Sequence, residues 1–187
     1  MINVAPLSEK RFNHCLGVAK CCYDLALRWG ADPMKAYLAG LFHDIAREMP
    51  KDELLRIARE HHCAIDDDML NAPILVHGAV SGIIAKENYH IIDKEILTAM
   101  EKHTLGDGST SLLDRILFLS DAIEPSRNYN GVEELRRMAQ ENLTLAVLRA
   151  TEQSLKYLEA KNLPPHPKTL AMLQQLKKEM QDSTKQM

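Results

Sequence analysis

Glycine and proline are scarce in this chain of 187 residues, which contains 8 of each. Such low contents exclude a collagen-like repeat and argue against disorder, while 45% hydrophobic and 26% charged residues are typical of an ordered globular protein. The length suffices for one substantial core and requires no second domain. We therefore expect a single domain over residues 1–187, with its core over about 8–170 and a C-terminal helix and polar tail after residue 167.

A long hydrophobic segment is also missing. The longest apolar stretch, Met69 to Ala85, has only 17 residues and is interrupted by Asn71, His77 and Ser81. It therefore predicts a buried helix and not a membrane span. The segment from Met1 to Lys10 has no basic region followed by an apolar run, which a secretory signal would have. We expect no membrane as a partner.

Positive charge is not concentrated anywhere in the chain. The formal net charge is -3 and the charged residues are scattered, so no basic face is available to hold a nucleic-acid backbone, and polymeric DNA or RNA is excluded as a partner. The cysteines contain no C-x-x-C pair and predict neither a disulfide framework nor a zinc site. Reduced thiols fit a cytoplasmic location. These cysteines are Cys15, Cys21, Cys22 and Cys63.

Alternation of β-branched and polar residues is absent over any run of five or more, whereas apolar residues recur every three or four positions. This periodicity predicts an all-α fold. Ser8 and Asp32 are expected to cap helices, and Gly30 to end the first one. Helices are expected over residues 9–29, from 33, over 51–61, 73–88, 94–103 and 111–121, as one broken helix or two over 132–161, and after 167, with an acidic loop at 66–68.

Several histidines and an aspartate occupy the apolar faces of these helices. His14 shares a face with Val18 and Leu25, His103 lies with Ile96 and Met100, and Asp121 lies with Leu117 and Phe118. A single histidine in a helix is more often a hydrogen-bonded core or surface residue than a metal ligand. However, a buried ionised carboxylate or unpaired imidazole costs several kcal/mol, and one metal ion can satisfy several such groups.

Small residues accompany two further histidines. His43 follows the stripe Ala36, Ala39 and Gly40, which would let a neighbouring helix approach and share a site; the alternative is tight helix packing alone. His77 precedes Gly78, which predicts open space beside the imidazole; the alternative is a buried histidine bonded to a serine. With Asp44, the set supplies four imidazole nitrogens and two carboxylates, which suit two transition-metal ions better than Ca²⁺ or Mg²⁺. The set is His14, His43, Asp44, His77, His103 and Asp121.

The order of these residues carries a family resemblance. His14, the pair His43-Asp44 and then Asp121 resemble the H…HD…D signature of the HD-domain phosphohydrolase superfamily, and the added histidines resemble its two-metal members. The strings LVHGA (75–79), EKHTLG (101–106) and LSDAIEPSR (119–127) resemble the YqeK subfamily over about residues 8–170. The sequence departs from that subfamily at Arg47 and Ala122, where lysine is more common.

The resemblance implies a fold, an activity and a set of ligands. It implies an all-α HD-domain bundle that hydrolyses diadenosine tetraphosphate symmetrically to two ADP with a di-iron centre. One metal takes His14, His43, Asp44 and Asp121, and the second takes His77 and His103, with Asp44 as the bridging catalytic ligand. Two ions about 3.5–4 Å apart can share a hydroxide and lower the pKa of water from ~15.7 to about 7. Manganese, cobalt or zinc would suit the same donors.

The expected substrate contacts are less distinctive than the ligands. Arg127, which follows Asp121 by six residues, could grip a phosphate bidentately, or it could be an exposed arginine paired with Glu124. Lys102 and Arg47 are further phosphate contacts, although solvated charges are the commoner fate of such residues, and Thr104 could orient the turn or bind phosphate.

Three other functions remain open at this point. They are a nucleoside monophosphate phosphatase, a cyclic-nucleotide phosphodiesterase and a non-catalytic nucleotide-binding HD module. The chain has no G-x-S-x-G elbow or glycine-rich phosphate loop, which excludes acyl-transfer and P-loop mechanisms. A homodimer is also open.

Overall fold

A computed structural model describes the backbone of residues 1–185 and the side chains of residues 1–182. The last two residues of the predicted polar tail lie outside this range. No strand occurs in the described part of the chain, which confirms the all-α prediction. The elements are α1 (Glu9–Trp29), α2 (Pro33–Phe42), α3 (Lys51–Glu60), α4 (Asp67–Asn71), the 3-10 turn η1 (Pro73–Val76), α5 (His77–Tyr89), α6 (Lys94–Lys102), α7 (Leu112–Ile123), α8 (Val132–Glu141), α9 (Leu143–Ala160) and α10 (Pro167–Lys185).

The predicted caps form at the first two helices. The Ser8 hydroxyl accepts a hydrogen bond from the backbone N–H of Arg11 and so satisfies one free donor of the first turn of α1. Gly30 ends this helix in a left-handed conformation with φ 78°, which glycine adopts without steric strain. The Asp32 carboxylate accepts from two backbone N–H groups at the start of α2. Local chemistry therefore sets both ends of the α1–α2 hairpin.

Two local predictions are corrected, and one open choice is settled. The acidic segment at 66–68 is not a loop, because Asp66 accepts from the Met69 N–H and caps the short helix α4. Pro73 begins a 3-10 turn, and the α-helix starts only at His77. Residues 132–161 form two helices, because Asn142 is extended and its side chain caps α9 by accepting from Leu145 N–H.

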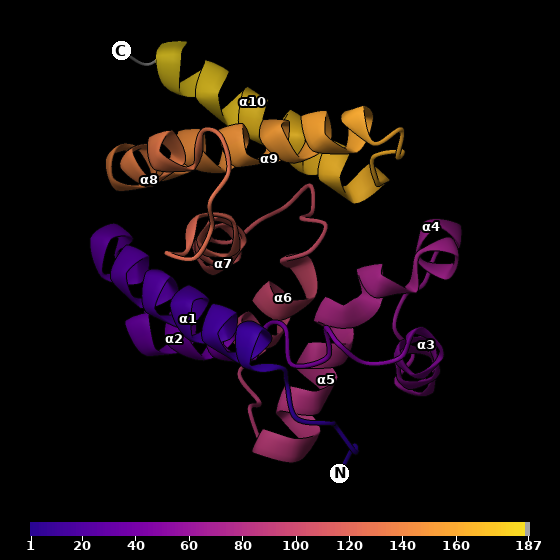
Figure 1. The fold of residues 1–187 in the computed structure, drawn as a ribbon. Helices are drawn as coiled ribbons and strands as arrows, with labels where there is room; N and C mark the ends of the chain where they lie inside the picture. Colours follow the sequence, from indigo (N-terminus) through magenta and orange to yellow (C-terminus); the bar gives the residue numbers. More distant parts are fainter. Residues whose placement is uncertain (186–187) are drawn as a thin grey trace.

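The helices are arranged around α7. Helices α8, α9 and α10 lie together on one side, and the α1–α2 hairpin lies on the other (Figure 1). Helix α7 runs between these groups and contacts α1, α2, α6, α8 and α9. Helices α5 and α6 pack on each other, and α3, α4 and η1 extend from α5 at the side of the molecule. Residues far apart in the sequence thus meet near the middle of the fold.

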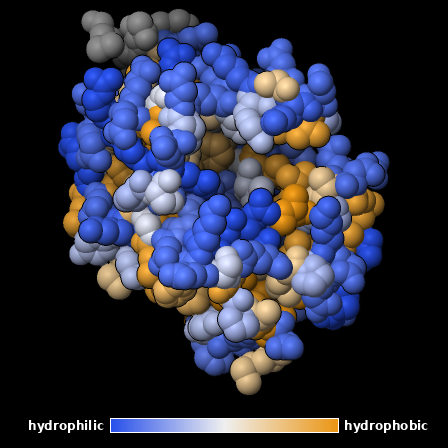
Figure 2. Space-filling model, viewed as in Figure 1, coloured by the Kyte–Doolittle hydropathy of each residue, from blue (hydrophilic) through white to orange (hydrophobic). Residues whose placement is uncertain are grey.

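Two hydrophobic clusters make up the core. The larger one joins α1, α2 and α5 through α10, and the smaller one joins α3, α4, η1 and α5. Phe42, at the end of α2, packs against both clusters, so His43 and Asp44 follow at the junction between them. The face seen in Figure 2 is mostly hydrophilic and is hollowed near its centre. No helix within residues 1–185 is both long and apolar enough to span a bilayer.

Candidate metal centre and phosphate-binding cavity

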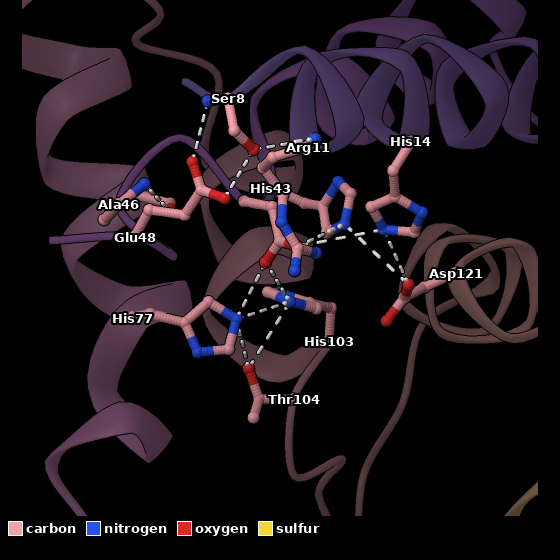
Figure 3. Close-up of polar contacts among 12 residues, drawn as sticks. Ser8, Arg11, His14, His43, Ala46, Glu48, His77, His103, Thr104 and Asp121 are labelled. Carbon is pink, nitrogen blue, oxygen red and sulfur yellow. Dashed lines mark hydrogen bonds and ion pairs between the residues drawn. The ribbon is translucent and has the colours of Figure 1, made fainter. Parts of the chain in front are cut away.

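All six predicted ligands converge in one place (Figure 3). Helix α1 supplies His14 from its second turn, and α7 supplies Asp121. His43 and His103 end α2 and α6, while His77 begins α5 directly after the 3-10 turn. The histidines and Asp44 are buried, and the Asp121 side chain is 28% exposed. The tertiary fold therefore gathers residues that are separated by as much as 107 positions into one cluster, from His14 to Asp121.

Three of the histidines share a local device at a helix or turn end. The Nδ1 atoms of His43, His77 and His103 lie 2.6, 2.5 and 2.6 Å from the backbone carbonyl three residues earlier. Carbonyl groups at a helix end have no partner within the helix, so an imidazole can satisfy one of them. Because a carbonyl oxygen only accepts, each Nδ1 must carry the hydrogen. Each Nε2 therefore keeps its lone pair and points into the cluster.

Asp44 lies at the centre of these lone pairs. Its Oδ1 atom is 2.9 Å from Nε2 of His77 and 3.7 Å from Nε2 of His103. Its Oδ2 atom is 3.5 Å from Nε2 of His43 and 3.7 Å from Nε2 of His14. The two oxygens of one carboxylate thus face two different pairs of histidines. This is the arrangement that a carboxylate bridging two cations requires.

The nitrogen and oxygen atoms that meet in the cluster are better suited to bind a divalent metal than to hydrogen-bond one another. Nε2 of His14 and of His43 are buried and have no hydrogen-bond partner. The Nε2 atoms of His77 and His103 are 3.1 Å apart, although each has a lone pair. Nitrogen and carboxylate acceptors that face each other in a buried site require a cation between them. Within the described residues, His14, His43 and Asp121 form one compact ligand group, and His43, Asp44 and His103 form another.

The protonation states agree with metal binding. Burial lowers the pKa of His43 to about 4 and also lowers the pKa of His77. Burial alone would raise the pKa of Asp44, but the imidazoles of His103 and His77 hold it well below its usual range. Neutral imidazoles and an ionised carboxylate are the forms that bind a metal.

His14 differs from the other histidines in its surroundings. Burial would lower its pKa, but the carboxylates of Asp121 and Glu124 beside its two ring nitrogens raise it above 6.5. Its Nε2 atom lies 3.1 Å from Oδ1 of Asp121, and its Nδ1 atom lies 3.0 Å from Oε1 of Glu124. His14 is thus held between two carboxylates, whereas each of the other three histidines contacts a backbone carbonyl through Nδ1.

Two glycines bring the ligand helices together. A Cβ atom on Gly40 would lie 2.7 Å from Cα of Ala19, so the small-residue stripe does give the close approach of α2 to α1 that the sequence predicts. A Cβ on Gly78 would lie 2.6 Å from the Met100 carbonyl and 3.1 Å from the His103 ring. The end of α6 therefore fills the space beside Gly78, and the open space beside the His77 imidazole lies instead on the side of the cavity that His77 lines.

The cluster opens into a cavity of about 290 Å³ with a basic rim. Of the four substrate contacts predicted from the sequence, Arg47, Thr104 and Arg127 line this cavity. Arg127 donates to Oδ1 of Asp121 at 2.5 Å and lies 3.8 Å from Glu124. Lys102 does not line this cavity. Its amine donates to the Ser109 carbonyl, and the residue lines another cavity.

Two residues of the site were missed in the sequence. Arg11 lines the cavity and contacts Oδ2 of Asp44 at 2.5 Å. Glu124 is 1% exposed, and its carboxylate accepts a hydrogen bond from Nδ1–H of His14. The signal was present in both cases, because Arg11 precedes His14 by three residues and Glu124 follows Asp121 by three, so each shares a helical face with a ligand.

The comparisons with known proteins show which family this chain resembles. The family model for the HD domain matches residues 11–126. A symmetrical bis(5'-nucleosyl)-tetraphosphatase of Halalkalibacterium halodurans is 37% identical, over 91% of this chain and 90% of that protein. One of the same name from Bacillus subtilis is 36% identical over 87% of each. A crystal structure from Clostridium acetobutylicum, described as a predicted HD superfamily hydrolase involved in NAD metabolism, superposes with a TM-score of 0.90 at 35% identity and 92% coverage of both chains.

Proposed function

Because this chain belongs to the HD-domain family, we propose that it is a metal-dependent phosphohydrolase that cleaves diadenosine tetraphosphate symmetrically into two ADP. The substrate is taken from the relatives named for this activity, whose sequences align with about nine-tenths of this chain. The observation in this molecule that supports it best is the meeting of four imidazole lone pairs and two carboxylates at the floor of a cavity with arginines at its rim.

We propose His14, His43, Asp44 and Asp121 as ligands of one ion, and His77, His103 and Asp44 as ligands of a second. Divalent ions in such a site supply Lewis acidity and activate water for attack on phosphorus. We propose iron for both positions, and manganese, cobalt or zinc are compatible with the same nitrogen and oxygen donors. The separate contacts of the two Asp44 oxygens support its role as the bridging ligand.

The residues at the rim would bind and orient the polyphosphate. Arg11, Arg47 and Arg127 present guanidinium groups to the cavity, and these bind phosphate oxygens bidentately. Thr104 places its hydroxyl 3.4 Å from Nε2 of both His77 and His103, so it can hydrogen-bond a phosphate that enters there. Phe118 and Ala150 add an apolar wall from α7 and α9, which suits a nucleoside. We retain Lys102 only as an untested prediction.

The wider predictions also stay proposals. We propose that residues 1–187 act as one domain, because one hydrophobic cluster contains residues of both α1 and α10. We propose a cytoplasmic location, in keeping with four free thiols. The homodimer predicted from the sequence remains a prediction.

Product analysis tests the activity directly. The metal-loaded protein is incubated with diadenosine tetraphosphate in oxygen-labelled water, and the products are separated by chromatography. Because the bond that breaks joins the attacked phosphorus to its leaving oxygen, product identity reports which P–O–P bridge is cleaved, and the product that carries the label reports which phosphorus is attacked. We expect only ADP, with label in one of the two molecules formed. ATP plus AMP would contradict symmetrical cleavage.

Two other substrate classes serve as comparisons in the same assay. Rapid release of phosphate from a nucleoside monophosphate, with no cleavage of the dinucleotide, would favour a monophosphatase, and opening of a cyclic nucleotide would favour a phosphodiesterase. Binding of diadenosine tetraphosphate without turnover by the metal-loaded protein would indicate a non-catalytic nucleotide-binding module.

A further inference from the structure

Glu124 is a buried carboxylate that belongs to neither proposed ligand set. It ends α7 and is 1% exposed. Its Oε1 atom lies 3.0 Å from Nδ1 of His14 and accepts from the Ser126 hydroxyl. Its Oε2 atom accepts from the Ser126 backbone N–H at 2.8 Å. Both oxygens are therefore held in place, and one of them faces an imidazole.

His14 needs such a side chain because of its place in the helix. His43, His77 and His103 are oriented by free backbone carbonyls at helix or turn ends. His14 lies inside α1, where the carbonyls already accept hydrogen bonds from the helix itself. An acceptor for its Nδ1–H must therefore come from another element, and Glu124 on α7 is that acceptor.

Helix α1 is shaped to admit this carboxylate. Gly17 lies one turn after His14, and a Cβ atom at this position would stand 2.7 Å from Oε2 of Glu124. Any larger residue would push against the carboxylate that contacts His14. Glycine at position 17 therefore leaves the space that the buried Glu124 carboxylate occupies beside His14.

We propose that Glu124 is a positioning residue that fixes the Nδ1–H tautomer and the ring orientation of His14. A carboxylate only accepts hydrogen bonds, so Glu124 favours the hydrogen on Nδ1 and leaves the Nε2 lone pair for a cation between Nε2 and the oxygens of Asp121 and Asp44, which lie 3.1 and 3.7 Å from Nε2. Without a cation, Asp121 competes with Glu124 for the same ring hydrogen. A metal-binding histidine whose other nitrogen bonds a carboxylate is held in the orientation that the metal requires. The inference rests on the proposed function only in taking His14 as a metal ligand.

The variant Glu124→Gln reverses the polarity of this contact without changing its size. The Ser126 N–H still requires an acceptor, so the amide oxygen turns to Ser126 and the NH₂ group faces Nδ1 of His14. The His14 proton must then move to Nε2, where it points at Asp121. We expect nitrogen NMR of the metal-free protein at alkaline pH, where imidazoles are neutral, to show the tautomer balance of His14 shifting from the Nδ1–H towards the Nε2–H form. Metal binding should weaken about 10- to 100-fold.

Two further variants separate positioning from packing. Glu124→Asp keeps a carboxylate and should retain the Nδ1–H form. Gly17→Ala displaces the Glu124 carboxylate without replacing either partner, and it should shift His14 partly towards the Nε2–H form. Glu87→Gln, an exposed position on α5, is the matched control and should change neither signal.

Retention of the Nδ1–H form and of metal affinity in Glu124→Gln would overturn the inference. If that variant does not fold, an unchanged His14 signal in Gly17→Ala would overturn it equally. A wild-type protein that shows the Nδ1–H form and binds metal, but makes no ADP, would contradict the proposed function and leave the inference standing.

Discussion

Clusters of histidine and carboxylate occur at two places among the described side chains, and they differ in how the ring nitrogens are matched. Between α4 and α10, Nε2 of His166 lies 2.9 Å from Oδ2 of Asp66, and Nδ1 of His166 accepts the Lys168 backbone N–H at 3.2 Å. Both nitrogens thus have a partner of opposite polarity. In the cavity, Nε2 of His14 and of His43 is buried and makes no hydrogen bond, although carboxylate oxygens lie nearby.

The comparison shows that proximity does not identify a metal site. Asp66, Asp68 and His166 bring their possible ligand atoms within 4.8 Å of one another, as the two cavity groups do. At His166 the Nε2–H donates to a half-exposed carboxylate, and no lone pair is left for a cation. The cavity differs because imidazole lone pairs there face one another and carboxylate oxygens, and a cation between these acceptors would satisfy them.

The change with the largest expected effect is Asp44→Ala. If both oxygens of Asp44 serve separate ions, the variant should lose metal from both positions, and turnover should fall by more than the about 10- to 100-fold seen for outer-shell changes. Metal analysis after anaerobic loading, together with ADP formation, measures both quantities. Asp52→Ala, at an exposed position on α3, is the control. A variant that kept one ion and substantial turnover would show that Asp44 does not bridge.

A smaller loss of activity is expected from Arg127→Ala, which tests whether the rim of the cavity binds phosphate while its floor binds metal. Hydrogen bonds to charged groups contribute about 1.5–3 kcal/mol, so kcat/KM should fall about 10- to 100-fold. Metal content should stay at the wild-type value, because the proposed contact is to phosphate. Arg56→Ala, whose side chain pairs with glutamates on the surface of α3, is the matched control. Unchanged kinetics would make Arg127 an ordinary partner of Asp121.

The smallest effect on activity is expected from His166→Ala, which tests the other half of the comparison. Loss of a buried imidazole and its hydrogen bonds should lower the free energy of unfolding by about 1–3 kcal/mol, measured by denaturant titration. Metal stoichiometry and kcat/KM should not change. Loss of a bound metal ion in this variant would mean that His166 is a ligand and that the comparison fails.

Much of the fold and site could be predicted because it depends on local signals. Ser8, Gly30 and Asp32 mark helix ends through interactions with residues close in sequence. Asp66 was misread for lack of context, since an acidic run predicts a loop as readily as the cap of a short helix. The inward faces of His14 and Asp121 follow from helical spacing, whereas Asp44 was named through its place beside His43 and the family resemblance.

Other features depend on elements that meet only in three dimensions. Lys102 adjoins His103 in sequence, yet its amine turns away to Ser109 and Asp107, because neighbours on a helix point in different directions. Arg11 and Glu124 reach the site from the faces of α1 and α7, and Gly78 faces the end of α6 instead of open space.

The sequence by itself determined which groups are available and which helical face each occupies, because periodicity and capping are local properties of the chain. Only the tertiary structure decided which lone pairs meet. The Nδ1 atoms of His43, His77 and His103 are matched within three residues, whereas His14 depends on Glu124, 110 positions away. The polarity of a buried contact is set by the atom across the gap, and that atom is known only once the helices have packed.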